Sequence, residues 1–104
     1  MIFVTTSTIS GKEITETLGM VRGSTVRARN VGRDVFAGLK NLVGGEISEY
    51  TELLAQAREQ AIKRMIDDAR SLNADAIISV RFNTSQVSQG SAEMLAYGTA
   101  VKLK

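Results

Sequence analysis

Hydrophobic residues recur at helical spacing over one long segment, residues 48–72. Ser48 can cap the N-terminus of this segment, and Glu49 and Glu52 lie in the first turn, where the helix dipole favours acidic side chains. Asn73 follows, and asparagine can adopt the left-handed conformation that ends many helices. The spacing predicts a helix over 48–72, whose apolar face consists of Tyr50, Leu54, Ala57, Ala61, Met65, Ala69 and Leu72.

A shorter helical pattern precedes it, over residues 31–43. Asn30 is a suitable N-cap residue, and the glycines at 44 and 45 are typical of a helix end. The apolar residues that define the pattern are Val31, Val35, Leu39 and Leu42. We expect a second helix here, followed by a tight turn.

Four segments show the residue types and the alternation of β-strands: 1–6, about 16–29, about 76–83 and about 93–103. Glycines at 19 and 23 interrupt the second segment and predict a bulge or a bend there. The last segment has two unlike faces. The larger residues are Leu95, Tyr97, Thr99, Val101 and Leu103, and the small ones are Ala96, Gly98 and Ala100.

The connecting segments complete the predicted topology. Residues 7–15 and 84–92 are predicted loops, and Gln89-Gly90 is typical of a hairpin turn. With 104 residues, the chain fits a single domain, 1–104. The order ββααββ predicts an α+β fold, a small antiparallel β-sheet with two helices packed on one side.

Charge is unevenly distributed, although the net charge is only +2. Residues 22–40 contain five basic residues and one acidic residue, whereas residues 46–75 contain seven acidic and four basic residues. Such neighbouring segments can bind an anion, or can pair with their complement on a second copy of the chain. Because only five residues are aromatic and no reader motif is visible, nucleic acid is not an expected partner.

The chain contains no His and no Cys. Ser-His-Asp and Cys-His catalysis, disulfides and thiolate or imidazole metal sites are therefore excluded. Asp67 and Asp68 are adjacent on the predicted helix and diverge, so they form no acid–base pair. The glutamates at 46, 49, 52 and 59 could hold a hard cation, but a solvated acidic helix face is the favoured interpretation. We expect no enzyme, no cofactor and no metal site.

Three features of the sequence indicate the compartment in which the protein is found. No stretch approaches the roughly 18 apolar residues of a membrane span, and the apolar run at the N-terminus is too short for a signal peptide. The lack of cysteine fits a reducing compartment. We expect a cytoplasmic protein with no membrane partner.

Six short motifs are spread in order along the whole chain: Val4-Thr5-Thr6, Gly11-Lys12, Arg33-Asp34, Val43-Gly44-Gly45 with Tyr50 after it, Ala74-Asp75-Ala76 and Gly98-Thr99-Ala100-Val101. Their order and spacing resemble the YbjQ-like family of small, uncharacterised prokaryotic proteins. The resemblance implies a dodecin-like or YbjQ-like subunit that assembles into a ring-shaped homopentamer, sometimes as paired rings. It also implies a label of heavy-metal binding, for which methionine supplies the only soft ligands in this chain.

The candidate ligand-binding or interface residues are Arg33, Asp34, Gly44, Gly45 and Tyr50. Arg33, near a helix N-terminus, could bind a phosphate or carboxylate, but an ion pair that fixes the assembly is favoured. The two glycines most simply form a helix end and a tight turn, with close approach to a ligand as the alternative. Tyr50 is expected in core or interface packing, or with its hydroxyl in a cavity between subunits.

Our leading hypothesis is a non-enzymatic structural or binding protein whose functional form is a ring of identical chains. We expect the basic segment 22–40 of one copy to contact the acidic segment 46–75 of the next. The alternative is a carrier of a small ligand or a metal, with its site at the subunit boundary near Arg33, Gly44 and Tyr50.

Overall fold

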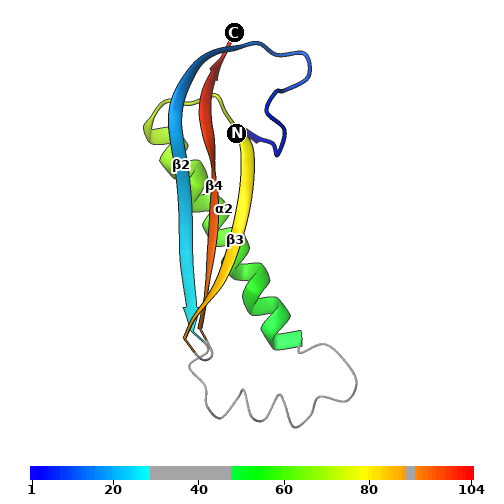
Figure 1. The fold of residues 1–104 in the computed structure, drawn as a ribbon, viewed down its shortest axis with the longest axis vertical. Helices are drawn as coiled ribbons and strands as arrows, with labels where there is room; N and C mark the ends of the chain where they lie inside the picture. Colours follow the sequence, from blue (N-terminus) through cyan, green and yellow to red (C-terminus); the bar gives the residue numbers. More distant parts are fainter. Residues whose placement is uncertain (29–47, 89–90) are drawn as a thin grey trace.

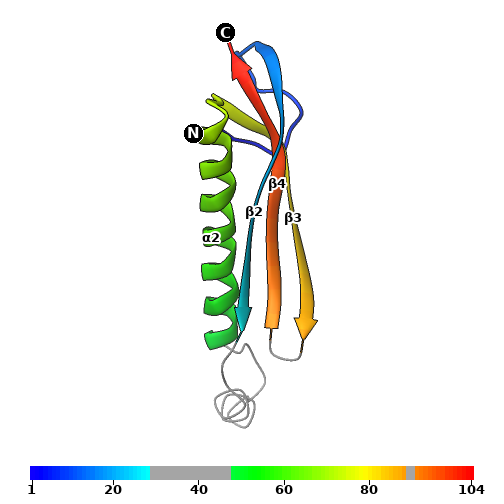
Figure 2. The ribbon, with the colours of Figure 1, turned by 90° about the vertical axis from the view of Figure 1, so that its left-hand side faces the viewer.

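The computed structural model describes residues 1–28, 48–88 and 91–104. The sheet has four strands in the order β1-β3-β4-β2, and the helix α2 lies across one face of it (Figure 1, Figure 2). The described part of the chain is therefore a two-layer structure. Its elements are β1 (Ile2–Phe3), β2 (Ile14–Ala28), α2 (Ser48–Ser71), β3 (Ala76–Ser88) and β4 (Ser91–Leu103).

The predicted fold class, an antiparallel sheet with two helices packed on one side in the order ββααββ, is wrong. β1 runs parallel to β3, with Ile2 opposite Ala76, so the sheet is mixed. The described residues contain one helix, in the order ββαββ, and the helix predicted over 31–43 lies outside them. The parallel pair arises because β2 and β3 occupy both sides of β4, which leaves the outer edge of β3 for β1.

The N-terminal strand is shorter than the one predicted over 1–6. The Val4 N–H donates to the Ile77 carbonyl and the Val4 carbonyl accepts from the Val80 N–H, both at 2.9 Å, so the segment still follows β3 beyond Phe3. Ser79, which lies between these contacts, has a φ of 54° and sits at a register shift in β3. This bulge interrupts the regular pairing of the two strands.

The β3–β4 hairpin is longer than predicted. The strand expected over 76–83 continues to Ser88, through a segment predicted as part of a loop over 84–92, and Ser88 pairs with Ser91. Residues 81–86 are exposed, so this polar segment forms a strand without the apolar alternation that marks a buried face. The antiparallel pairing confirms the predicted hairpin, whose turn lies outside the described residues.

The long helix α2 confirms the prediction for 48–72 and packs its apolar face on the sheet. Asn73 has a φ of 58°, and the Ala74 N–H donates to the Ala69 carbonyl at 3.1 Å, so the helix ends as predicted. In the described part of the chain, no helix has both the length and the apolar character that a membrane span requires. The buried residues of the packed face are Ala57, Ala61, Met65 and Ala69.

The two glycines of β2 have different roles. Gly19 has a φ of 131° and lies at a register shift against β4, which is the predicted bulge. Gly23 lies beneath the helix, where a Cβ would come 2.2 Å from the Ala61 carbonyl oxygen and 2.3 Å from the Met65 nitrogen. Gly23 therefore lets the helix backbone approach the strand directly.

The strand β4 has the two unlike faces predicted for it, and its small residues face the helix. Ala96, Gly98 and Ala100 are buried, whereas Leu95 and Tyr97 on the opposite face are only half-buried. Figure 2 shows α2 on one side of the strands, and Figure 1 shows the strands in front of it. The core of the described structure therefore lies between the helix and the small-residue side of the sheet.

Candidate functional site on the open face of the sheet

The predicted site residues fall mainly outside the described part of the chain. Arg33, Asp34, Gly44 and Gly45 all lie there, so their roles stay predictions. Tyr50 lies in the first turn of α2, and its side chain is likewise outside the described part. The site that the described residues do form comes instead from three strands.

The open face is the side of the sheet opposite α2, on which Met20, Arg22 and Val26 of β2 lie beside Leu95 and Tyr97 of β4. The register places these residues on one side, since directly opposed residues of paired strands point the same way. Met20 and Val26 have 65% and 57% of their surface exposed. A cluster of exposed apolar side chains often marks a surface that contacts a ligand or another protein, whereas single exposed apolar side chains are common on any protein surface.

A hollow of about 370 Å³ lies on the open face. Two pairs from the strand ladders contribute to it: Arg22 is opposite Tyr97, and Asn83 is opposite Leu95. Small-molecule sites combine an apolar lining with a few polar groups in this way. The full lining consists of Met20, Arg22, Phe82, Asn83, Leu95 and Tyr97.

Arg22 is the charged group of the hollow. Its backbone N–H donates to Asp68 Oδ2 at 3.0 Å, a contact that joins β2 to α2 and leaves the guanidinium uninvolved. Within the described residues, the ion pairs are Arg70–Asp67, Lys102–Asp75 and Lys104–Glu13, so Arg22 takes part in none. A guanidinium stays protonated at physiological pH. The hollow therefore has a permanent positive charge.

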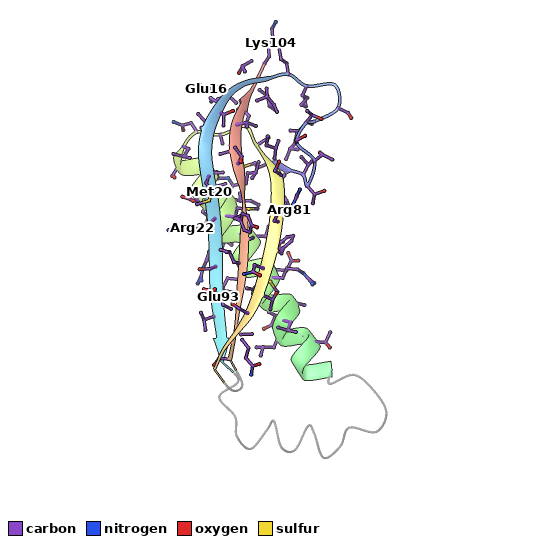
Figure 3. All side chains as sticks on the ribbon, viewed as in Figure 1. Glu16, Met20, Arg22, Arg81, Glu93 and Lys104 are labelled. Carbon is purple, nitrogen blue, oxygen red and sulfur yellow. The ribbon has the colours of Figure 1, made fainter. Side chains whose placement is uncertain are left out.

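A second arginine flanks the same tyrosine. Tyr97 lies opposite Arg22 on β2 and opposite Arg81 on β3, and Figure 3 shows the two arginines along these strands. Arg81 Nη1 donates to the carbonyl oxygens of Thr5, at 2.8 Å, and Val80, at 2.9 Å. Arg81 is thus held by the backbone of the sheet edge, whereas Arg22 lies on β2, across Tyr97 from Arg81.

The sequence alone did not predict this group of residues. Arg22 belongs to the basic segment 22–40 and Tyr97 to the larger face of the last strand, and no sequence pattern links the two. Their pairing depends on the register between β2 and β4, which a single sequence does not reveal. The available signal was the alternation of Met20 and Arg22 on one side of a strand.

The fold and the site define a small two-layer protein with a mixed sheet, one helix-covered face and one open face that holds a basic hollow. The chain belongs to the YbjQ-like family: the family profile described as "Putative heavy-metal-binding" matches residues 1–104. This match confirms the resemblance noted in the sequence.

The relatives of the chain are uncharacterised prokaryotic proteins. It is 58% identical over 103 residues to a UPF0145 protein of Methanosarcina acetivorans, covering 99% of this chain and 97% of that protein. It is also 58% identical over 104 residues to a UPF0145 protein of Archaeoglobus fulgidus, covering 100% and 96%. A crystal structure of a Pediococcus pentosaceus protein of unknown function from the DUF74 family has the same fold. Its TM-score is 0.67, with 19% identity and coverage of 100% of this chain and 98% of that one.

The described residues do not fit a heavy metal. Soft metals prefer thiolate, imidazole or thioether ligands, and only methionine is present in this chain. Met65 and Met94 are buried in the core, whereas Met20 is exposed on the open face and Met1 begins the chain. The Met94 sulfur accepts a hydrogen bond from Thr84 Oγ1 at 3.2 Å. Among the described residues there is also no group of three or more Asp or Glu that could hold a cation.

Proposed function

We propose that this protein is a non-enzymatic cytoplasmic module that works as a closed ring of identical subunits, a pentamer or a pair of pentamers. The open face is the observation that supports this proposal most directly. Met20 and Val26 are more than half exposed there, beside the half-buried Leu95 and Tyr97. A neighbouring copy that covered this face would remove apolar surface from water, which stabilises by roughly 25 cal/mol per Å².

The two edges of the sheet restrict how copies can meet. On β2, the Arg22 N–H donates to Asp68, and the Ser24 carbonyl accepts from Arg64 Nη1 at 2.5 Å, so helix side chains cover the centre of this edge. On β3, residues 82–88 have no strand on their outer side in the described structure. The two edges therefore differ from each other. A contact between two unlike surfaces, repeated head to tail from copy to copy, is the kind of contact that closes a ring.

We propose that the basic segment 22–40 of one copy contacts the acidic segment 46–75 of the next. Of these two segments, the structure describes residues 22–28 and 48–75. Within one subunit, Asp68 already accepts the backbone N–H of Arg22. Glu52 and Glu59 of α2 are exposed, which supports a contact between them and the arginines of a neighbouring copy. Such exposed pairs would select the partner and its orientation more than they would add affinity.

Three aspartates of the described structure support a non-enzymatic role, because each holds a structural contact. Asp75 Oδ2 accepts the Leu103 N–H at 2.8 Å, and Asp67 lies 3.6 Å from the guanidinium of Arg70. With Asp68 bound to the β2 backbone, these three aspartates hold structural contacts. General acid–base chemistry needs a carboxylate placed beside a reacting group instead.

Light scattering after size-exclusion chromatography tests the assembly. At micromolar concentration in physiological salt we expect a mass of five or ten chains of 11.2 kDa, and the mass of a single chain would contradict the proposal. Val26→Lys places a charge on the open face and should lower the mass. Leu72→Lys is the matched control, because Leu72 is 41% exposed at the helix end. Equal masses for the two variants would refute the open face as the contact.

A second candidate function is a carrier of a small ligand at the subunit boundary, which the hollow on the open face favours. The metal-carrier form of this alternative has no support from the described ligand types. Native mass spectrometry of freshly purified protein separates the candidates. A stoichiometric extra mass would favour the carrier, whereas bare chains would favour the structural module.

A further inference from the structure

The hollow on the open face combines a free positive charge with apolar walls. We propose that it binds a planar, apolar carboxylate of one or two rings, with the carboxylate on Arg22 and the ring over Leu95 and Tyr97. This inference stands on the residues of one subunit and does not depend on the proposed ring. A neighbouring copy that covered the open face would enclose the bound ligand.

The charge of the ligand follows from the surroundings of Arg22. Asp68 of α2 accepts the backbone N–H of Arg22, at 3.0 Å, and forms no ion pair with its guanidinium. On the open face, Glu93 lies opposite Val26, four residues along β4 from Tyr97. Four strand residues span roughly 13 Å, and Figure 3 shows Glu93 well separated from Arg22 along the sheet. The guanidinium therefore keeps its parallel N–H donors for an anion, and a carboxylate matches them with two hydrogen bonds.

The apolar character of the ligand follows from the rest of the lining. Met20 and Leu95 provide aliphatic surface on either side of the Arg22–Tyr97 row, and β3 borders the hollow at Phe82 and Asn83. A methionine side chain adapts its shape to a bound ring. Asn83 offers a further hydrogen-bonding group across from Leu95. A volume of about 370 Å³ lies near the lower end of small-molecule sites, which suits one or two rings.

A bare inorganic anion fits this hollow less well. Phosphate would reach Arg22 but would leave the apolar lining in water, so most of the available burial would be lost. A neutral ring would cover the lining but would leave the guanidinium without an anion. The guanidinium of Arg22 and the apolar lining together therefore favour a ligand with both a carboxylate and an apolar ring.

Equilibrium dialysis against sodium 2-naphthoate, detected by its own fluorescence, tests the proposal. We expect saturable binding with one site per chain, and about tenfold weaker binding of 2-naphthylmethanol and of inorganic phosphate, which each keep one half of the ligand. Arg22→Gln should weaken naphthoate binding about tenfold. The matched control is Arg58→Gln, an exposed arginine on α2, which should change it by less than about twofold.

Several outcomes would overturn the inference. These are no saturable binding of naphthoate, equal binding of naphthoate and 2-naphthylmethanol, or unchanged binding by Arg22→Gln. If Arg22→Gln alters the far-ultraviolet circular dichroism, Leu95→Trp replaces it, because a larger side chain there fills the hollow and should reduce binding by a similar factor. Light scattering on the same samples keeps the two proposals apart. A monomer that binds naphthoate contradicts only the ring, and a ring that does not bind it contradicts only the ligand site.

Discussion

Substituting Gly23 by alanine should destabilise the protein more than adding a methyl group at any other position of β2. The Cβ of an alanine would lie 2.2 Å from the Ala61 carbonyl oxygen and 2.3 Å from the Met65 nitrogen. Both obstacles are helix backbone, so no side-chain rotation can relieve the contact. Normal contact distances between heavy atoms are about 3.5 Å or more, so α2 would have to move away from β2 by more than about 1 Å.

Such a movement would loosen the packing of the buried helix face against the sheet. Inserting atoms into a well-packed core costs typically 1–3 kcal/mol, and a backbone obstacle places Gly23→Ala at the upper end, about 3 kcal/mol. For a domain of this size, each kcal/mol lowers the melting temperature by roughly 4–8 °C. We therefore expect a decrease of more than about 12 °C, and a matching loss in the free energy of unfolding measured by urea denaturation.

Gly11→Ala is the control for this experiment. Gly11 has a φ of 76° and no atom within 4 Å of the position a Cβ would occupy, so an alanine there meets only backbone strain. That strain is about 1–2 kcal/mol, less than we expect at Gly23. If Gly23→Ala were as stable as the wild-type protein, or less damaging than Gly11→Ala, the close packing of α2 on β2 would be refuted.

Four further predictions concern two residues with a positive φ, one hydrogen-bonded carboxylate and the removal of metal. Asn73→Val should lower stability by about 1 kcal/mol in thermal melts, because a β-branched residue resists a φ of 58°, and Asn73→Gly should not. Ser79→Gly should raise the melting temperature, since a φ of 54° strains a non-glycine residue by about 1 kcal/mol; a lower value would mean that the serine side chain stabilises the bulge. Asp75→Ala should cost about 1–2 kcal/mol in urea denaturation, because its carboxylate accepts the Leu103 N–H at 2.8 Å and lies 4.0 Å from Lys102. Dialysis against EDTA should leave the melting temperature unchanged, because the described residues contain no group of three or more acidic side chains that could hold a cation, and a decrease would show that a bound metal stabilises the protein.

The local structure could be predicted where one physical effect dominates. The helix expected over 48–72 matches α2 to within one residue, because its apolar period, cap and terminator all agree. Asn73 adopts the predicted left-handed conformation, and the small residues of β4 lie together on one buried face. These features depend on residues close together in the chain.

Predictions failed where the structure depends on distant segments. The parallel pairing of β1 with β3 is set by which sheet edge remains free, and no residue of the N-terminal segment encodes that choice by itself. The polar end of β3 was predicted as a loop, because its exposed residues lack the apolar alternation used to recognise strands. Gly23 was expected to mark a bulge or a bend, but its requirement comes from a helix that lies more than 30 residues away in sequence.

The candidate site illustrates the same limit. The sequence predicted a basic segment that could bind an anion, and Arg22 belongs to it. It could not predict that Arg22 faces Tyr97, or that Asn83 and Leu95 complete the same hollow, because two strand registers must be known first. The candidates at Arg33 and Gly44 stay predictions, since both lie outside the described residues.

The central claim is that this family member works as a ring of identical subunits. Native mass spectrometry of freshly purified protein tests this claim most directly. We predict an assembly of five or ten chains of 11.2 kDa each, and a lower mass for Val26→Lys under the same conditions. A wild-type protein observed only as a single chain of 11.2 kDa would contradict the account.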